Sequence, residues 1–226
     1  MDAEGRLREL RARAKDCRDP AAEDDTLALL LALARLRGAR SILEIGTAEG
    51  LTSVALLLAC PGAAVTTVEA EEDRWLRARE NFADFAVTDR VRALLGDAAD
   101  VLPALSGPYD LIFLDGPKAQ YVNYLPEIKR LLAPRGLLYA DDVLLYGWVN
   151  GREKTPRKRR SIVRKLREFL AAAGADEDFE MRVFEVGEGD ALCSASGFSA
   201  EENALLEGTG AEIPLSACFP AEEDEE

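Results

Sequence analysis

The feature that most constrains this chain is a regular alternation, from Ser41 onward, of short apolar runs with stretches of helical periodicity. This alternation is typical of a parallel sheet whose strands are joined by crossover helices. The apolar runs predict strands at 41–45, 64–69, 91–95, 110–115 and 136–141, and the stretches between and after them predict helices at about 52–60, 73–85, 98–105, 120–132 and 156–173.

The two ends of the chain extend this pattern. Helical periodicity at about 3–17 and 25–37 predicts two N-terminal helices separated by Pro20. Residues 179–197 form two extended runs joined by Gly187, Glu188, Gly189 and Asp190, which is typical of a hairpin. We therefore predict an α/β, Rossmann-like fold with a seven-stranded mixed sheet: five parallel strands plus a C-terminal hairpin with one antiparallel strand, and helices on both faces.

One domain is predicted over residues 1–198, with the N-terminal helices as its first 38 residues. Residues 199–226 lie beyond the last predicted strand and end in EEDEE. We predict that they form an acidic, solvated C-terminal tail.

The residue types present limit the possible chemistry. The chain has no histidine, and its four cysteines lie far apart without a C-x-x-C pair. Zinc sites of the usual kind and Ser-His or Cys-His nucleophiles are therefore excluded, and acid–base work falls to Lys, Asp, Glu or Tyr. The apolar runs are shorter than the roughly 20 residues that cross a bilayer, and the N-terminus does not read as a secretory signal. We predict a cytoplasmic protein without a membrane partner.

Charge is segregated along the chain. The formal net charge of −14 alone argues against nucleic acid as a partner. Residues 151–167, however, hold nine basic residues against one acid, whereas the last five residues are all acidic. The sign of each patch therefore matters more than the sum.

A glycine-containing turn follows the first predicted strand. The segment EIGTAEG runs from Glu44 to Gly50, includes Thr47, and leads into a helix that begins near Thr52. Glycines at Gly46 and Gly50 allow close approach of a ligand, and the helix N-terminus offers free N–H groups. The turn lacks the G-x-G-x-x-G spacing that cradles a pyrophosphate. It favours a ligand without pyrophosphate.

Acidic residues close the next two predicted strands. Glu69 ends the second strand, where an acid can accept hydrogen bonds from both hydroxyls of a ribose. Asp97, followed by Ala98, comes after the third strand and can receive an adenine amino group. The alternative for both acids is an ordinary charged strand end.

Three carboxylates, Asp115, Asp141 and Asp142, follow the fourth and fifth predicted strands. Because the carboxyl ends of neighbouring parallel strands meet at one edge, these charges would repel one another unless a cation lay among them. Oxygen ligands without His or Cys favour Mg²⁺ or another hard divalent cation; solvated strand ends are the alternative. Lys118 lies close behind Asp115, and a lysine near a cation loses its proton readily, as a general base must.

These motifs together resemble one known family. EIGTAEG, the acid at Glu69, GDA at 96–98 and LIFLDGPKAQY are similar to the O-methyltransferases that include catechol and caffeoyl-CoA methyltransferases, over about residues 41–198. The resemblance implies S-adenosylmethionine as methyl donor, held by Glu44, Gly46, Thr47, Gly50, Thr52, Glu69, Asp97, Ala98 and Asp115.

The resemblance also implies a metal site and a mechanism. The family's triad would be Asp115, Asp141 and an Asn, but this chain has Asp142 in the third place. Lys118, as the base, and Asp115 would be the catalytic residues, and Tyr121 would shape the acceptor pocket or simply pack. The reaction would be an in-line displacement on the sulfonium methyl group, favoured by an acceptor with two adjacent oxygens. A homodimer is implied by the resemblance alone.

The basic stretch bears on the identity of the acceptor. A small catechol-like substrate gives no reason for basic residues beside the active-site edge, whereas phosphate contacts do. DDVLLYGWV followed by a basic helix resembles the bacterial branch that methylates 5-hydroxyuridine in tRNA, and this is the acceptor we predict. The alternatives are a small catechol-like or hydroxycinnamoyl acceptor and a non-catalytic nucleotide-binding module. The residues predicted to contact RNA are Arg157, Lys158, Arg159, Arg160 and Arg164.

Overall fold

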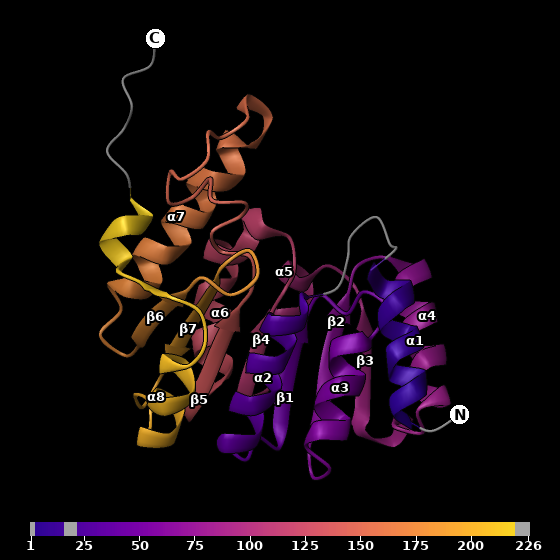
Figure 1. The fold of residues 1–226 in the computed structure, drawn as a ribbon. Coiled ribbons are helices and arrows are strands. Elements are labelled where there is room, and N and C mark those ends of the chain that lie inside the picture. The colour runs from indigo at the N-terminus through magenta and orange to yellow at the C-terminus, as the bar shows by residue number, and fades with distance from the viewer. Residues whose placement is uncertain (1–2, 16–21, 220–226) are drawn as a thin grey trace.

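The computed structural model describes residues 3–15 and 22–219, and all its strands belong to one mixed sheet (Figure 1). The strands are β1 (Ser41–Ile45), β2 (Ala64–Glu69), β3 (Val91–Leu95), β4 (Tyr109–Leu114), β5 (Leu132–Ala140), β6 (Glu180–Phe184), β7 (Asp190–Ser194) and β8 (Glu212–Ile213). The five predicted parallel strands lie within about one residue of the predicted bounds, except at the start of β5. The predicted hairpin is formed by β6 and β7, although Asp190, predicted in its turn, begins β7.

The strand order is β3-β2-β1-β4-β5-β7-β6-β8. Strands β1 to β5 pair in parallel, and β7 runs antiparallel to both β5 and β6. The order reverses between β1 and β4, because the chain moves outward from β1 to β3 and then returns to the other side of β1. In open α/β sheets, ligands bind outside the carboxyl ends of the strands at such a reversal.

The predicted count of seven strands is wrong, because the sheet formed by the described residues has eight. The additional strand, β8, pairs antiparallel with β6 through Val183 with Ile213 and Phe184 with Glu212. It is only two residues long and precedes Pro214, so it lacks the alternating apolar run that identifies longer strands.

Helices cover both faces of the sheet, as predicted. Alternate strand residues point to opposite faces: in β1, Ile42 belongs to one core cluster and Leu43 to the other. The first cluster is completed by α1 (Ala3–Lys15), α2 (Asp24–Leu36), α3 (Leu51–Ala59), α4 (Glu72–Asp84) and α8 (Ala200–Glu207), and the second by α5 (Ala98–Val101), α6 (Tyr121–Leu131) and α7 (Arg160–Gly174).

Short 3₁₀ segments extend several of these helices and turns. They are η1 (Thr88–Arg90), η2 (Leu102–Ala104), η3 (Lys118–Gln120), η4 (Arg157–Arg159) and η5 (Leu215–Cys218).

Of the predicted first helix, residues 16 and 17 lie outside the described residues. Over residues 3–15 and 22–219, no helix has the length and apolar content that crossing a bilayer requires.

The segment after Ser199 is folded as far as the structure describes it, so the predicted solvated tail does not begin at residue 199. Ser199 caps α8 in a capping box with Glu202, a pattern that the sequence displays as S-x-x-E. Leu206 and Cys218 are buried, in the first and second core clusters respectively. The acidic run at residues 222–226, which suggested a tail, lies outside the described residues.

Candidate active site

A pocket of about 390 Å³ lies at the carboxyl ends of β1, β2, β3 and β4, where the strand order reverses. Its volume lies within the roughly 300–1,000 Å³ of sites that hold small molecules. Seven residues predicted for the donor, the metal or catalysis line it: Gly46, Glu69, Asp97, Ala98, Asp115, Lys118 and Asp142. Among the lining residues that sequence reasoning missed are Ala48, Glu71, Arg74, Pro117 and Tyr124; most of these follow strand ends directly, which is the signal that could have found them.

Both glycines of the β1–α3 turn are required by contacts within the protein. Gly46 has φ +102°, and a Cβ there would lie 2.1 Å from the carbonyl oxygen of Asp115. Gly50 has φ +80°, and a Cβ there would lie 2.6 Å from the Phe82 ring. Gly46 allows β1 and β4 to end side by side at the pocket, whereas Gly50 seats α4 against the start of α3. The protein's own packing therefore requires glycine at both positions, whether or not a ligand approaches the turn closely.

Glu44 lies within the sheet, outside the pocket lining. Its side chain is fully buried and accepts hydrogen bonds of 2.5 Å from the hydroxyls of Ser53 and Thr67. Burial raises the pKa of Glu44 to about 7, although these two hydrogen bonds oppose the rise. Glu44 thus ties the start of α3 to β2, and its place is that of a supporting residue beneath the turn.

Three other residues predicted for the donor also lie outside the pocket lining: Thr47, Gly50 and Thr52. Thr47 is buried and its hydroxyl lies 2.5 Å from that of Thr67, so it continues the network of Glu44. Thr52 is buried in the first turn of α3. These residues therefore support the β1–α3 turn without lining the pocket.

The two acids predicted to hold the ribose and the adenine are both at the pocket. Glu69 ends β2 and accepts hydrogen bonds from the backbone N–H groups of Ala48, at 2.8 Å, and Glu71, at 2.9 Å. Asp97 caps α5 and accepts a 2.8 Å hydrogen bond from the backbone N–H of Ala99. The Asp97 carboxylate is therefore fixed by the backbone of its own loop, and that of Glu69 by its own loop and by the β1–α3 turn, while both line the pocket.

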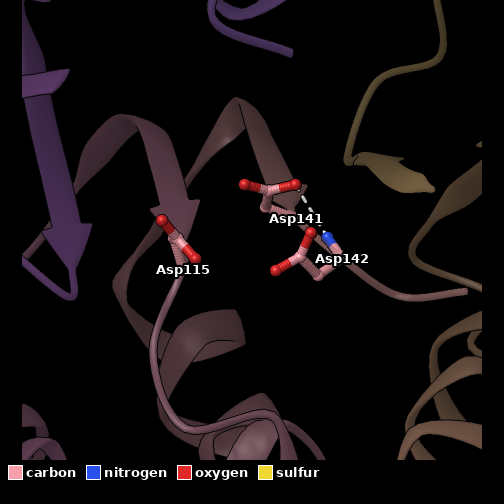
Figure 2. A group of neighbouring side chains, drawn as sticks. All are labelled: Asp115, Asp141 and Asp142. Atoms are coloured by element: carbon pink, nitrogen blue, oxygen red, sulfur yellow. Dashed lines mark hydrogen bonds between the residues drawn. The ribbon is translucent and has the colours of Figure 1, made fainter. Parts of the chain in front are cut away.

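The three predicted metal ligands come together where β4 and β5 end (Figure 2). Each of Asp115, Asp141 and Asp142 offers a carboxylate oxygen that lies within 4.8 Å of the other two. The backbone N–H of Asp142 donates to Asp141 Oδ1 at 2.7 Å. Asp142 has φ +56°, a left-handed conformation that Asp and Asn tolerate better than most residues. This turn directs two successive acids toward Asp115.

Asp141 is the most deeply buried of the three, with 2% of its surface exposed. Burial raises the pKa of Asp141 well above its usual range, Asp115 raises it further, and Lys118 opposes the rise. Oxygen donors crowded at this density fit a hard cation, since a positive charge among them would remove both the repulsion and the cost of burial.

Lys118 bridges two of these carboxylates. Its Nζ lies 2.8 Å from Asp115 Oδ1, 3.0 Å from Asp142 Oδ2 and 3.0 Å from the hydroxyl oxygen of Tyr121. Burial lowers the pKa of Lys118, but Asp115, Tyr121 and the other two acids outweigh it, so the pKa lies well above its usual value. These neighbours therefore keep Lys118 protonated, whereas the sequence analysis predicts that it loses its proton. Only neutralisation of those carboxylates would reverse this.

Tyr121 fixes Lys118 from below. Its hydroxyl donates toward the backbone carbonyls of Leu114, at 2.9 Å, and Asp141, at 3.1 Å, and accepts from Lys118. Its ring packs edge-on against Phe169 of α7 at 5.5 Å. Tyr121 is fully buried and does not line the pocket, so its contacts are those of a packing and positioning residue.

A buried polar network behind Asp141 was not anticipated from the sequence. Asp190, at the start of β7, shares a side-chain hydrogen bond with Asp141 and accepts hydrogen bonds from Tyr139, at 2.5 Å, and Thr26, at 3.2 Å. Burial raises the pKa of Asp190 above its usual value. The sequence signal was a single acid, Asp190, next to an apolar run. It was assigned to the hairpin turn, so no buried role was predicted for it. The network joins α2, β5 and β7 to the acid cluster.

The basic residues predicted to contact RNA lie together at the start of α7. Arg157, Lys158 and Arg159 form η4, Arg160 begins α7, and all four are exposed. Arg164, one turn later, is exposed and lies 3.7 Å from Glu168. The first turn of α7 has no acidic residue, although a helix N-terminus favours negative charge. In Figure 1 the segment before α7, in orange, projects at the top of the view.

Comparison with known proteins gives concordant results. A family model described as O-methyltransferase matches residues 5–196. A catechol O-methyltransferase from Niastella koreensis is 31% identical over 159 residues, which cover 68% of this chain and 70% of that protein.

Solved structures agree with the family match. The O-methyltransferase TomG from Streptomyces achromogenes, involved in tomaymycin synthesis and solved with S-adenosylmethionine, is similar with a TM-score of 0.75 and 29% identity, over 87% of this chain and 91% of that one. An O-methyltransferase from Bacillus cereus, solved with S-adenosylhomocysteine, gives a TM-score of 0.72 and 25% identity, over 86% and 91%.

Proposed function

This chain belongs to the O-methyltransferase family and is an S-adenosylmethionine-dependent enzyme, and we propose that its acceptor presents two adjacent oxygens to a hard divalent cation. The observation that carries the proposal is the group of three carboxylates at the pocket edge, two of them in contact with Lys118. Family membership sets aside the non-catalytic nucleotide-binding module that the sequence alone left open.

The cation would be held by Asp115, Asp141 and Asp142. An all-carboxylate donor set suits Mg²⁺ or a similar hard ion better than zinc or copper. A bound cation would act as a Lewis acid that stabilises negative charge on the acceptor oxygen. Asp142 in place of an amide adds one negative charge to the donor set.

The methyl donor would occupy the pocket at the ends of β1, β2 and β3. In this proposal Glu69 would hold the ribose hydroxyls, and Asp97 with Ala98 the adenine; the supporting observation is that all three line the pocket at strand ends. Gly46 and Asp115 form the floor where β1 and β4 meet. The sulfonium methyl group would then face the acid cluster.

Lys118 would take the acceptor's proton. In the transfer, an acceptor oxygen forms a bond to the methyl carbon, the carbon–sulfur bond breaks, and S-adenosylhomocysteine leaves. Asp115 and Tyr121 hold Nζ at the pocket edge. Because these contacts favour the ammonium form, Lys118 would act as a base only after a cation had offset the charge of its carboxylate partners and Nζ had released its own proton to solvent.

For the acceptor itself we propose 5-hydroxyuridine in tRNA, converted to 5-methoxyuridine. The supporting observation is the exposed basic segment, Arg157 to Arg160, on the chain that leaves Asp142. Phosphates of an RNA strand would complement these side chains, and O5 with the neighbouring O4 would provide two adjacent oxygens. A tRNA substrate suits the predicted cytoplasmic location. The homodimer implied by the resemblance stays a prediction.

A small catechol-like acceptor is the second candidate. The specific observation in its favour is the relative from Niastella koreensis, whose name is catechol O-methyltransferase. A catechol offers the same pair of adjacent oxygens, so the acid cluster suits both acceptors equally. The observation that favours tRNA over catechol is the basic segment.

The experiment that tests the acceptor is methyl transfer from labelled S-adenosylmethionine to tRNA lacking 5-methoxyuridine, beside the same assay with catechol. Changing Arg159 and Arg160 together to Ala should weaken tRNA binding and reduce the slope of log affinity against log salt by about two. Turnover of catechol should not change. A matched control changes the exposed Arg40 and Arg92 to Ala, because they lie near the amino ends of β1 and β3, away from the pocket at the carboxyl ends.

Two results would contradict the proposal. Unchanged tRNA affinity in the Arg159 and Arg160 double variant would remove the RNA assignment. Full turnover after exhaustive chelation, together with full turnover of Asp141→Ala, would remove the cation. Loss of the modification in cells that lack the protein, measured by mass spectrometry of tRNA nucleosides, would identify the nucleotide.

A further inference from the structure

An aromatic pair stands on the loop that follows the acid cluster: Tyr146 is exposed, whereas Trp148 is half-buried and packs against the second core cluster. Tyr146 has 57% of its surface exposed. No other large apolar side chain among residues 3–15 and 22–219 is as exposed. Its ring lies 4.9 Å from that of Trp148, tilted by 53°. We call residues 145–148 the aromatic turn.

The backbone of the aromatic turn is unusual. Leu145, Tyr146 and Gly147 have φ values of +45°, +59° and +75°. Left-handed conformations at two successive non-glycine residues cost free energy, so they persist only where the surroundings impose them. Such strain at an exposed aromatic residue suggests that its presentation matters for function.

Neighbouring elements impose this conformation. The backbone N–H of Tyr146 donates to the Glu188 carboxylate at 2.5 Å, and that of Leu145 donates to the Glu188 carbonyl at 3.0 Å. On the other side, Arg167 of α7 donates to the carbonyl of Val149 at 2.9 Å. The turn is therefore fixed at both ends, and the Tyr146 ring is presented to solvent without needing to be ordered on binding.

The aromatic turn lies between the acid cluster and the basic segment. Glu188 accepts the hydrogen bond from the Tyr146 N–H and lies near Asp142. Burial raises the pKa of Glu188, and the negative charge of Asp142 raises it further. Gly147 packs against Arg152, whose Cβ would lie 3.3 Å from a Cβ added to the glycine. Neither Tyr146 nor Trp148 lines the donor pocket, and the carbonyl of Trp148 accepts a 3.4 Å hydrogen bond from the hydroxyl of Thr155, two residues before the basic segment begins at Arg157.

We propose that the Tyr146–Trp148 pair is a stacking platform for an unpaired nucleobase next to the nucleotide that is methylated. This inference rests on the proposed function, with tRNA as the acceptor. Bases in a single-stranded loop expose their faces and stack on aromatic side chains, while adjacent basic residues hold the backbone. A small acceptor would fill the pocket without reaching the pair.

The first test compares Tyr146→Ala with Tyr146→Phe, which keeps the ring. With a stem-loop RNA that carries 5-hydroxyuridine in its unpaired loop, Tyr146→Ala should raise KM roughly tenfold, as expected for loss of one stacked base, and Tyr146→Phe should restore most of it. With catechol as acceptor, kcat/KM should stay within about twofold of wild type. Leu36→Ala, at a side chain that is 44% exposed on α2, is the matched control and should change nothing.

A second readout uses the tryptophan itself. In a Trp75→Phe background, Trp148 is the remaining tryptophan of the two in the chain. Its fluorescence should be quenched saturably by the stem-loop RNA and far less by a fully paired RNA of equal length.

Three outcomes would overturn the inference, and they differ from a failure of the proposed function. Wild-type KM for RNA in Tyr146→Ala, or equal loss with catechol and RNA, would show that the pair is not a platform for a flanking base. Unchanged Trp148 fluorescence on saturation with RNA would show the same. If instead wild-type enzyme fails to methylate tRNA, the proposed function fails first, and the inference falls with it.

Discussion

The buried carboxyl of Glu44 makes folding stability depend on pH in a way that one substitution should remove. In the folded protein the pKa of Glu44 is about 7, compared with 4.5 for an ordinary glutamate, because burial disfavours the charged form. The folded state therefore binds the proton more tightly than the unfolded chain. Its contribution is fully present below pH 4.5 and is lost as the pH rises through 7.

The magnitude follows from the pKa difference. A rise from 4.5 to about 7 at about 1.4 kcal/mol per pH unit means that Glu44 lowers the free energy of unfolding by about 3 kcal/mol between acid and mildly alkaline pH. Glu44→Gln carries no titrating group and keeps the shape of the protonated side chain. The variant should match wild type near pH 4.5 and exceed its stability by up to about 3 kcal/mol above pH 7.

Thermal unfolding of the donor-free protein across pH 4.5 to 8 is a suitable assay. A gap of about 3 kcal/mol corresponds to about 6–12 °C in Tm for a chain of this size. Glu80→Gln, at an exposed position of α4, controls for the change in net charge. Parallel wild-type and Glu44→Gln profiles, with a constant gap at every pH, would refute the reasoning, because they would mean that Glu44 has the same proton affinity in both states.

Three other substitutions probe the site and its frame. Lys118→Met should lower kcat roughly 10²–10⁴-fold, as for loss of a general base, with donor affinity measured by calorimetry unchanged; wild-type turnover would remove Lys118 from the mechanism. Gly46→Ala should destabilise by roughly 2–4 kcal/mol in urea unfolding, because its Cβ would meet the Asp115 carbonyl at a positive φ, whereas Gly62→Ala, with open space around it, should have little effect. Leu206→Ala should cost roughly 2–5 kcal/mol; a smaller loss would mean that α8 contributes little to the core.

Periodicity was sufficient to predict the sheet because each strand carries its own apolar run. Strands β1, β2 and β3 begin and end at the predicted residues. The helices α3 and α4 lie within one residue of the predicted bounds, whereas the helix predicted at 98–105 is α5 to Val101 and then the 3₁₀ segment η2 to Ala104. The eighth strand has only two residues, and its pairing with β6 depends on how residues 200–211 fold back. No local pattern reports that, so the strand count and the extent of the tail were the parts missed.

The meeting of side chains could be predicted where their position follows from strand ends alone. Asp115, Asp141 and Lys118 meet because β4 and β5 are neighbours and parallel. The placement of Glu44 could not be deduced, because residue spacing does not distinguish a strand residue aimed at the pocket from one aimed at α3. Asp190 was missed for a related reason, since its contact with Asp141 crosses from β7 to the end of β5.

The excess of acidic residues and the proposed RNA contact are compatible once distance is considered. At physiological ionic strength charges are screened over roughly 8 Å, so a phosphate near Arg157 to Arg160 responds to those side chains rather than to the net charge of −14. Elsewhere the acidic surface repels the RNA backbone. The charge distribution would then orient the substrate as well as attract it, since favourable approach is confined to the end of the molecule where the segment before α7 projects (Figure 1). Reversing the sign of that segment should abolish RNA binding, whereas removing acids far from it should mainly add nonspecific binding.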